Sequence, residues 1–297
     1  MLVDSPGPSR PSTLIIGAGR LGTILAVALQ RAGWPVMIVA RGARSAARAT
    51  DRGLRVLRSM DDAPRSHIVL LCVPDDAIAS TALALASAPH APAAGAIVLH
   101  TSGAVPVTAL DALATTARAT GCLHPLQTVA EESESDVLHG APAAITGSAA
   151  ALDAAERLAA AVGLVPFRLV DDAKPLYHAA SSMAANLTVG LLDAAIRMAA
   201  AAGMPDADAR RALPALARAA VDRMLHVGAE SALTGPIRRG DAGTVRAHLD
   251  VMDRQVPELV PLYIHAARQT LALARRAGLA DAHADAVARI LDRSVEP

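Results

Sequence analysis

Four polar side chains recur at every fourth position between residues 174 and 186 of this 297-residue chain. They are Lys174, His178, Ser182 and Asn186, and the first and last are the only lysine and the only asparagine of the chain. Residues four apart lie on one side of a helix, so the spacing predicts a polar ridge on a helix over residues 174–202. The residues between them are mostly Ala, Leu and Met, which predicts that the rest of this helix faces a core.

An ammonium, an imidazole, a hydroxyl and a carboxamide in one row could transfer protons and orient a small polar ligand. A solvated stripe at a helix start is the alternative, although a lysine near a helix N-terminus is unfavourable for the helix dipole. Because lysine can release a proton and arginine cannot, we expect Lys174 to act as the proton donor, with His178 as the second candidate. The catalytic candidates are Lys174, His178, Ser182 and Asn186.

A glycine-rich turn near the N-terminus predicts a phosphate-binding site. The sequence TLIIGAGRLGTILAVALQRAG places Gly17, Gly19 and Gly22 between a strand-like run and an apolar helix, and the strand-like run PVMIVA follows. In this context GxGxxG is typical of a dinucleotide site, with the pyrophosphate at the helix N-terminus. A turn that binds no phosphate is the alternative.

The end of the second strand-like run bears on the choice between NAD and NADP. NAD enzymes usually carry an Asp or Glu there for the ribose hydroxyl, whereas this chain reads VARGARS, with Arg41 and Arg44. An arginine suits a 2′-phosphate, so the sequence favours NADP(H) over NAD, with an ordinary exposed arginine as the alternative. The cofactor-binding candidates from this segment, the glycine turn and later strand ends are Gly17, Ala18, Gly19, Arg20, Leu21, Gly22, Arg41, Arg44, Val73, Pro74, Thr101, Ser102 and Gly103.

Strand-like and helical segments alternate up to about residue 171. Continuous apolar strands that alternate with helices predict an α/β domain of Rossmann type, with a mostly parallel, doubly wound sheet. Beyond that point only alanine-rich helices follow, which predicts an all-α C-terminal domain. We therefore expect a disordered lead-in at residues 1–11, an NADP-binding Rossmann domain at 12–171 and a helical substrate or dimerisation domain at 172–297.

Two further segments supply substrate-binding candidates. His124 closes a strand-like run at the sheet edge where ligands bind, with a buried structural histidine as the alternative. The segment ALTGPIRRGDAGTV could close over a site, or could simply connect two helices with Asp241 as an N-cap. The substrate-binding candidates are His124, Thr234, Gly235, Arg238, Arg239 and Asp241.

Composition argues against several other classes of protein. Basic and acidic residues balance at 28 each and aromatic residues make up only 1%, which argues against nucleic-acid binding. We find neither a signal-peptide pattern nor an 18-residue apolar stretch free of polar breaks, so we expect no membrane span. Cys72 and Cys122 lie in apolar runs, which favours buried free thiols in a reducing cytoplasm over a disulfide. No Cys/His spacing indicates a metal site.

Six motifs together resemble a known family. IGAGRLG, VPDDAI, HTSGA, HPLQT, KPLYHAASSMAANL and ALTGPIRRGDAGTV are similar to an uncharacterised Rossmann-like oxidoreductase family with a helical C-terminal domain of unknown function. That family is related to ketopantoate reductase, pyrroline-5-carboxylate reductase and the 6-phosphogluconate dehydrogenase superfamily, including the β-hydroxyacid dehydrogenases. The resemblance spans residues 13 to 250. It implies an NADP-binding domain, a 6-phosphogluconate dehydrogenase-like helical domain, an active site between the domains and a homodimer formed through the helices.

The resemblance also implies a reaction. In ketopantoate reductases and β-hydroxyacid dehydrogenases, a lysine on the first long helix after the Rossmann domain is followed one turn later by an asparagine. Lys174 matches that lysine, but the next position holds His178. The leading expectation is NADP(H)-dependent reduction of a small 2-oxo acid or similar carbonyl compound. An imine reductase or dehydrogenase, a non-catalytic NADP-binding sensor and a deazaflavin reductase are the alternatives, and the sequence leaves the substrate and the direction of reaction open.

Overall fold

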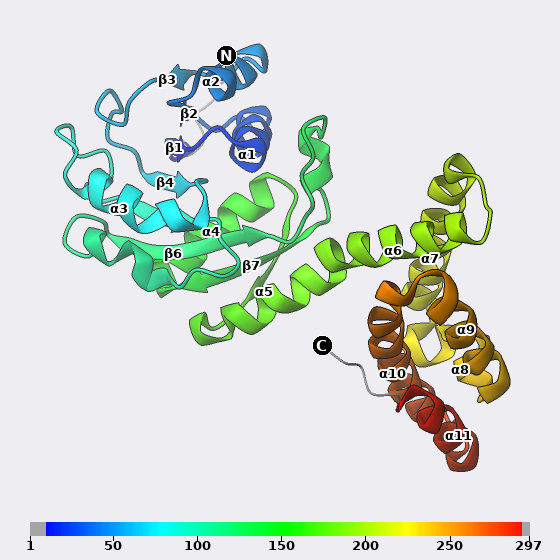
Figure 1. Cartoon of the computed structure of the whole chain (residues 1–297). Helices are drawn as coiled ribbons and strands as arrows, with labels where there is room; N and C mark the ends of the chain where they lie inside the picture. Colours follow the sequence, from blue (N-terminus) through cyan, green and yellow to red (C-terminus); the bar gives the residue numbers. More distant parts are fainter. Residues whose placement is uncertain (1–9, 293–297) are drawn as a thin grey trace, which may run out of the picture. The chain divides into compact units, whose positions relative to one another are not determined.

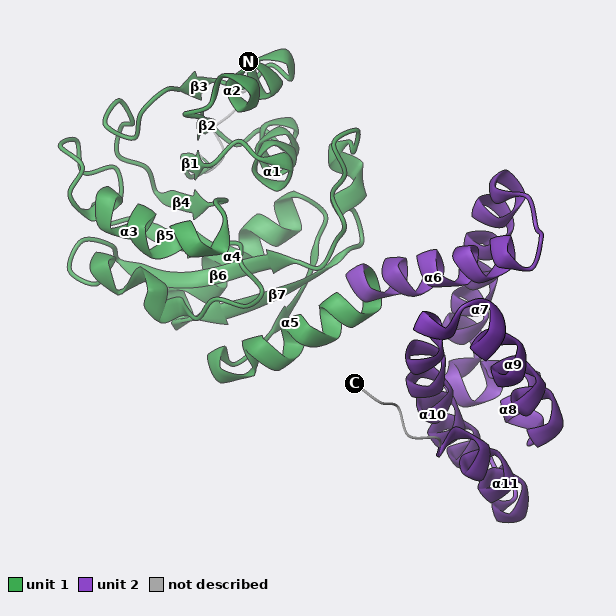
Figure 2. Cartoon of the chain, viewed as in Figure 1, with its two compact units in different colours: residues 1–185 green, residues 186–297 purple. Residues whose placement is uncertain are grey.

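The chain divides into two compact units, residues 1–185 and residues 186–297, in a computed structural model that describes residues 10–292 (Figure 2). The first unit extends beyond the expected limit at residue 171 because it takes in the helix that begins at Lys174. The expected lead-in at 1–11 falls mostly on residues 1–9, which lie outside the described residues.

Unit 1 is built on an eight-stranded sheet with the strand order β3-β2-β1-β4-β5-β6-β7-β8 (Figure 1). The strands are β1 (Thr13–Ile16), β2 (Val36–Val39), β3 (Val56–Leu57), β4 (Ile68–Leu71), β5 (Ile97–His100), β6 (Ala119–Pro125), β7 (Pro142–Gly147) and β8 (Val165–Arg168). All neighbouring strands run parallel except β6 and β7. The expected α/β fold of Rossmann type with a mostly parallel sheet is therefore confirmed. Strand β3 was not expected, because two residues are too few to show a periodic pattern.

Both faces of the sheet are covered. Ile15 of β1 packs into a core with α1 (Arg20–Arg31), α2 (Ala43–Asp51) and α4 (Ala149–Ala161). Its neighbours Leu14 and Ile16 point to the other face, where α3 (Ile78–Ala86) and the 3-10 turn Val107–Leu113 pack. A sheet buried on both sides explains why its strands read as continuous apolar runs. Polar groups at the carboxyl ends of β1, β2, β4 and β5 are thereby brought to one edge.

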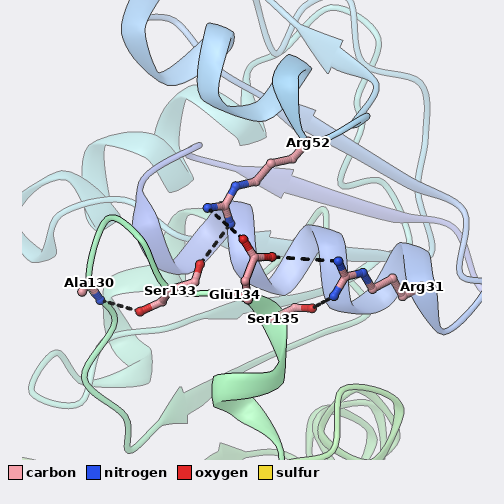
Figure 3. Close-up of polar contacts among 6 residues, drawn as sticks. All are labelled: Arg31, Arg52, Ala130, Ser133, Glu134 and Ser135. Carbon is pink, nitrogen blue, oxygen red and sulfur yellow. Dashed lines mark hydrogen bonds and ion pairs between the residues drawn. The ribbon is translucent and has the colours of Figure 1, made fainter.

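The connection between β6 and β7 is tied to the first two helices by polar contacts (Figure 3). Arg31 of α1 donates a hydrogen bond to Ser135 Oγ (2.7 Å) and lies 3.9 Å from the Glu134 carboxylate. Arg52, just after α2, donates to the Ser133 carbonyl (3.2 Å) and also lies 3.9 Å from Glu134. Exposed ion pairs of this kind stabilise a fold only slightly. Their main effect is to hold this connection against the helices that follow β1 and β2.

The described part of unit 2 is helical, which confirms the expected all-α region. Its helices are α6 (Thr188–Ala201), α7 (Asp206–Ala232), α8 (Gly235–Arg239), α9 (Ala242–Gln255), α10 (Val260–Arg276) and α11 (Asp281–Leu291). Val245, Ile264 and Val287 form part of a core shared by α9, α10 and α11. Helix α7 is interrupted at Gly228, whose φ of 78° is easy for glycine alone.

One continuous helical run covers the expected helix of residues 174–202, but it is not uniform. Helix α5 (Lys174–Ser182) leads into a π-helical turn, Met183–Leu187, and then into α6. The intervening apolar residues, which we expected to face a core, are exposed in the single chain; Leu176 is 79% and Met183 65% exposed. That expectation was wrong, because helical periodicity shows which residues share a face but not whether the face is covered within one chain.

The same helical run differs from the sequence expectation in another respect. In the described part of the chain, residues Asp171–Ala201 form one helical stretch long and apolar enough to cross a membrane, with a mean hydropathy of 1.3 over its best window. The high mean hydropathy comes from the many alanines of this stretch and not from any one strongly apolar residue. One such helix is weak evidence for a membrane span, and its residues up to 185 belong to unit 1 (Figure 2).

Candidate functional site

The turn between β1 and α1 has the geometry of a phosphate cradle. Gly17 has a φ of 109°, and a Cβ on Gly22 would lie 2.0 Å from the Gly17 carbonyl oxygen. Both positions therefore need glycine for the turn and for close helix packing. A Cβ on Gly19 would instead meet no atom within 4 Å. Gly19 is the N-cap of α1, and no side chain of the described residues caps that end. The first amides of α1 are thus open to a phosphate, so the residues present fit a dinucleotide.

A cavity of about 510 Å³ extends from this turn along the carboxyl ends of β1, β2, β3 and β4. The predicted cofactor residues that line it are Gly17, Ala18, Gly19, Arg41, Val73 and Pro74. None of the described residues that line it is acidic. The lining therefore offers no carboxylate of the kind that usually holds the ribose hydroxyls in NAD sites.

The cavity also has lining residues that sequence reasoning missed as cofactor ligands. Arg58 and Ser59 follow the two-residue strand β3 and line the cavity beside Arg41 and Ser45. Arg58 Nη2 donates a hydrogen bond to the Arg41 carbonyl oxygen (3.0 Å). Only recognition of the short β3 could have placed Arg58 at this edge. The predicted residues Arg20, Leu21, Gly22 and Arg44 are neighbours of the cavity in sequence but do not line it.

The loop after β5 turns on buried side chains. The His100 Nδ1 atom accepts a hydrogen bond from the Ser102 amide (3.1 Å), and Ser102 Oγ accepts from the amides of Ala104 and Val105. Thr101 Oγ1 donates to the Leu71 carbonyl (3.3 Å). The predicted contacts of Thr101 and Ser102 with a cofactor would therefore come from their backbone. The structure gives these two hydroxyls a loop-shaping role.

His100 is neutral in this environment. Burial, followed by the charge of Lys174 and then His124, lowers the pKa of His100 to about 3. Since Nδ1 accepts the Ser102 N–H, the single proton of the neutral ring belongs on Nε2. That buried Nε2 atom has no hydrogen-bond partner among the described residues.

Lys174 is the second buried nitrogen of the cluster. The residue is only 2% exposed, and its Nζ atom has no hydrogen-bond partner in the described chain. It is placed by the turn before α5, where Asp171 accepts hydrogen bonds from the Val107 amide (3.0 and 2.9 Å). The nearby Cys122 thiol donates to the Ser102 carbonyl (3.2 Å) and offers only a weak acceptor. An ammonium buried without partners is costly, so the arrangement needs an oxygen acceptor from elsewhere.

The Cys122 thiol does not compensate the charge of the buried Lys174 ammonium. Burial raises the pKa of its thiol to about 11, even though the charge of Lys174 acts in the opposite direction. The thiol therefore stays protonated and does not neutralise the ammonium. Cys72 and Cys122 are both free, as expected, so neither thiol is lost to a disulfide.

A group of three rings borders the lysine. Nδ1 of His124 is hydrogen-bonded to the Tyr177 hydroxyl (2.9 Å), and the rings of His124 and His178 are 6.2 Å apart. Burial, then His178 and then Lys174, lowers the pKa of His124 to about 4, so this ring is neutral at pH 7. A Cβ on Gly103 would lie 2.7 Å from His124 and 2.9 Å from His178, so any larger residue there would have to displace these rings. Tyr177 was missed, and its place beside His178 in the sequence was the one available signal.

The four residues of the predicted ridge have unequal surroundings. Lys174 is buried, Ser182 is partly buried, and His178 and Asn186 are exposed. The π-helical turn Met183–Leu187 changes the rotation per residue before Asn186 is reached, so the spacing of four no longer keeps it in the row. Lys174 and His178 come together with His124, whereas a shared site for Ser182 and Asn186 remains a prediction.

The predicted substrate residues of unit 2 form a separate local arrangement. An open hollow of about 680 Å³ is lined by Thr234, Gly235, Arg238, Arg239 and His283, among others. Arg238 donates to the Ala277 carbonyl (3.0 Å). Asp241 caps α9 by accepting from the amide and hydroxyl of Thr244, the N-cap role weighed as an alternative. Substrate binding by these residues stays a prediction, and no cluster of metal-ligating side chains occurs among residues 10–292.

Comparisons with known proteins identify two domains in the chain. Residues 5–125 match a Rossmann-like domain, and residues 141–270 match the domain of unknown function DUF2520. No curated protein matches the sequence.

Solved structures share the fold at low sequence identity. Protein BF3122 from Bacteroides fragilis, provisionally named an NADP oxidoreductase, is 20% identical, with a TM-score of 0.71 over 88% of this chain and 98% of its own. Protein TM1727 from Thermotoga maritima is 20% identical, with a TM-score of 0.70 over 89% and 98%. A pyrroline-5-carboxylate reductase from Coxiella burnetii is 16% identical, with a TM-score of 0.56 over 90% and 98%. The chain thus combines a Rossmann-like domain with the C-terminal domain of unknown function DUF2520, and it shares its fold with these solved structures.

Proposed function

We propose that this protein is an NADP(H)-dependent oxidoreductase that reduces a small 2-oxo acid or a similar carbonyl compound. The observation that carries the proposal is that two buried nitrogens, Lys174 Nζ and His100 Nε2, have no hydrogen-bond partner among the described residues. Both are hydrogen-bond donors, since the ammonium has no lone pair and the neutral His100 ring carries its proton on Nε2. Two donors at the ligand edge of a parallel sheet complement the oxygen atoms of a carbonyl or carboxylate group.

Among the described residues no acidic side chain lines the cavity, and this supports the choice of NADP. A carboxylate there would repel a 2′-phosphate, whereas Arg41 attracts it. The glycine turn would hold the pyrophosphate at the start of α1, and Val73 and Pro74 would border the nicotinamide half. When bound, the cofactor supplies the hydride.

The chain's own residues would act on the substrate oxygen. Lys174 would donate a hydrogen bond to the carbonyl oxygen, stabilise the negative charge that develops there and hold the proton that the product requires. Neutral His100 would donate a second hydrogen bond. His124, also neutral, would orient the site through Tyr177, and the exposed His178 is the second candidate for the proton donor.

An imine substrate is a second candidate. The similarity to a pyrroline-5-carboxylate reductase covers nearly all of both chains, and this favours a C=N bond as the reducible group. An imine nitrogen would need a proton at the same place as the carbonyl oxygen. The donors of Lys174 and His100 would therefore serve either substrate class.

The test follows NADPH absorbance with purified protein and a panel of 2-oxo acids and cyclic imines. Lys174→Ala is compared with wild type, and Arg55→Ala serves as a control for loss of an exposed cation away from the cavity. We expect oxidation by wild type and by Arg55→Ala, with a loss of about 10²- to 10⁴-fold in Lys174→Ala, the usual contribution of a general acid. Unchanged turnover in Lys174→Ala would contradict the role of the lysine. Tight NADPH binding with no oxidation across the panel would support a sensor without turnover.

A further inference from the structure

Arg58 has a defined position at the end of the cofactor cavity. It lies one residue beyond β3, and β3 pairs with β2 so that the exits of both strands are side by side. Its Nη2 atom donates to the Arg41 carbonyl oxygen (3.0 Å), which folds the guanidinium across the end of β2. A guanidinium has five N–H donors, so this one bond leaves most of them available.

The surroundings of Arg58 are cationic and polar. Arg41, Ser45, Arg58 and Ser59 line the same end of the cavity, and no acidic residue of the described chain lines it. Ser45 Oγ donates to the Gly42 carbonyl (2.9 Å), and Ser59 Oγ donates to Asp61 (3.1 Å), so both hydroxyls have fixed positions. Among the described residues, neither Arg41 nor Arg58 forms an ion pair. Two guanidinium groups without an ion-pair partner in one cavity favour the binding of an anion there.

We propose that Arg58 binds the 2′-phosphate of NADP together with Arg41 and is a determinant of specificity against NAD. This inference rests on the proposed function, since it concerns the same cofactor site. Arg44, which the sequence favoured as the second arginine, does not line the cavity. It lies instead near the Glu131 carboxylate, whose pKa is lowered first by Arg48 and more weakly by Arg44. Arg58 reaches the site because β3, although short, carries the chain back beside β2.

The experiment measures binding of adenosine 2′,5′-bisphosphate and of 5′-AMP by calorimetry, so no turnover is needed. We expect Arg58→Ala to weaken the bisphosphate by about 10- to 100-fold, the usual effect of losing a hydrogen bond between charged groups, and to leave 5′-AMP unchanged. Arg55→Ala removes an exposed arginine three residues earlier and should change neither ligand. Arg58→Lys, which keeps the charge but loses the planar fork, should give an intermediate loss of bisphosphate affinity.

Other results would overturn the inference. Equal weakening of both ligands by Arg58→Ala would mean that Arg58 only supports the Arg41 carbonyl and shapes the adenosine pocket. If Arg58→Ala bound the bisphosphate as tightly as wild type, and wild type still preferred the bisphosphate over 5′-AMP, the role of Arg58 would be contradicted. The proposal of an NADP site would stand. If wild type bound the bisphosphate and 5′-AMP equally well, both the role of Arg58 and the NADP site would be contradicted. Failure of NADPH oxidation with the binding pattern preserved would count only against the proposed reaction.

Discussion

Lys174 combines the chemistry of the site with a cost in stability. An ammonium that is 2% exposed and lacks a partner loses its hydration without compensation in the free protein. Methionine has a similar length and no charge, so we expect Lys174→Met to raise the free energy of unfolding by about 1–3 kcal/mol while it abolishes activity. Urea denaturation without ligand measures the change. A lower free energy of unfolding in Lys174→Met than in wild type would mean that the ammonium has a stabilising partner. Leu83→Met, on an exposed face of α3, is the control for the introduction of a methionine side chain.

His100 gives the fold a pH dependence whose sign follows from its pKa. The pKa falls from 6.5 in the unfolded chain to about 3 in the folded protein. Below pH 6.5 the unfolded chain therefore binds a proton that folded His100 refuses, so stability present above pH 6.5 is lost as the pH falls toward 3.

His100→Asn should remove this contribution while keeping an acceptor for the Ser102 amide. Between pH 7 and pH 5 we expect the variant to lose about 2 kcal/mol less free energy of unfolding than wild type. Denaturant titrations at the two pH values test this. His124, whose pKa is also lowered, makes its own contribution to the pH dependence of the free energy of unfolding. Because this contribution is present in both proteins, it serves as an internal reference. Parallel losses in wild type and variant would show that His100 takes up its proton normally in the folded state.

At this scale the sequence identified Lys174 but not its surroundings. Its uniqueness in the composition and its place at a helix start were visible, whereas its burial depends on the loop after β5, far away in sequence. His100, whose pKa is lowered in part by the charge of Lys174, is brought near it only by the fold. Arg58 escaped notice for a similar reason, because its position depends on pairing between β2 and the very short β3.

At the scale of elements, the β1–α1 turn offers two glycines with opposite expected behaviour. A Cβ on Gly22 would lie 2.0 Å from a backbone oxygen, so Gly22→Ala should cost about 1–3 kcal/mol or more and reduce cofactor binding through the fold. A Cβ on Gly19 would meet no atom of the described residues within 4 Å, and its φ of −69° suits any residue. Gly19→Ala should therefore fold normally yet lose NADPH affinity, because the methyl group occupies the path of the pyrophosphate.

Thermal unfolding and NADPH calorimetry on the two variants separate these effects. Normal NADPH affinity in Gly19→Ala would show that the pyrophosphate does not approach that backbone. A fully stable Gly22→Ala would show that α1 can move away from the turn. Gly243→Ala, in α9, where a Cβ would meet only the Asp241 carboxylate at 3.6 Å, is the control for a harmless glycine replacement.

The elements themselves were largely predictable where periodicity was long and uninterrupted. The apolar strands, the glycine turn and the change to helices near residue 171 follow from local pattern. The π-helical turn Met183–Leu187 has no such pattern, because its residues suit an ordinary helix equally well. It therefore broke the expected row at Asn186, whose place in a site the spacing alone could not decide.

At the scale of the whole molecule, unit 2 leaves an apolar surface uncovered. Eight large apolar residues of unit 2 are at least 46% exposed: Leu187 just before α6, Val189 and Leu191 on α6, and Leu216, Val221, Met224, Leu225 and Val227 on α7. Soluble single chains rarely leave so many together, so the surface requires a partner. We propose a second copy of this chain, because the formal net charge of +0 gives no attraction to an anionic membrane and a self-complementary face needs no other component.

Light scattering on the purified protein tests this proposal. We expect wild type to have twice the mass of one chain, and Leu225→Glu, at a site 75% exposed, to shift it toward the single chain because a charge would be buried in the interface. Leu83→Glu changes an equally apolar residue on α3 of unit 1, 61% exposed, and should remain dimeric. A monomeric wild type would contradict the proposal, and recovery of wild type only with detergent or lipid would favour a membrane as the partner of the apolar helices. A dimer lost in Leu225→Glu but kept in Leu83→Glu would assign assembly to the apolar surface of α6 and α7.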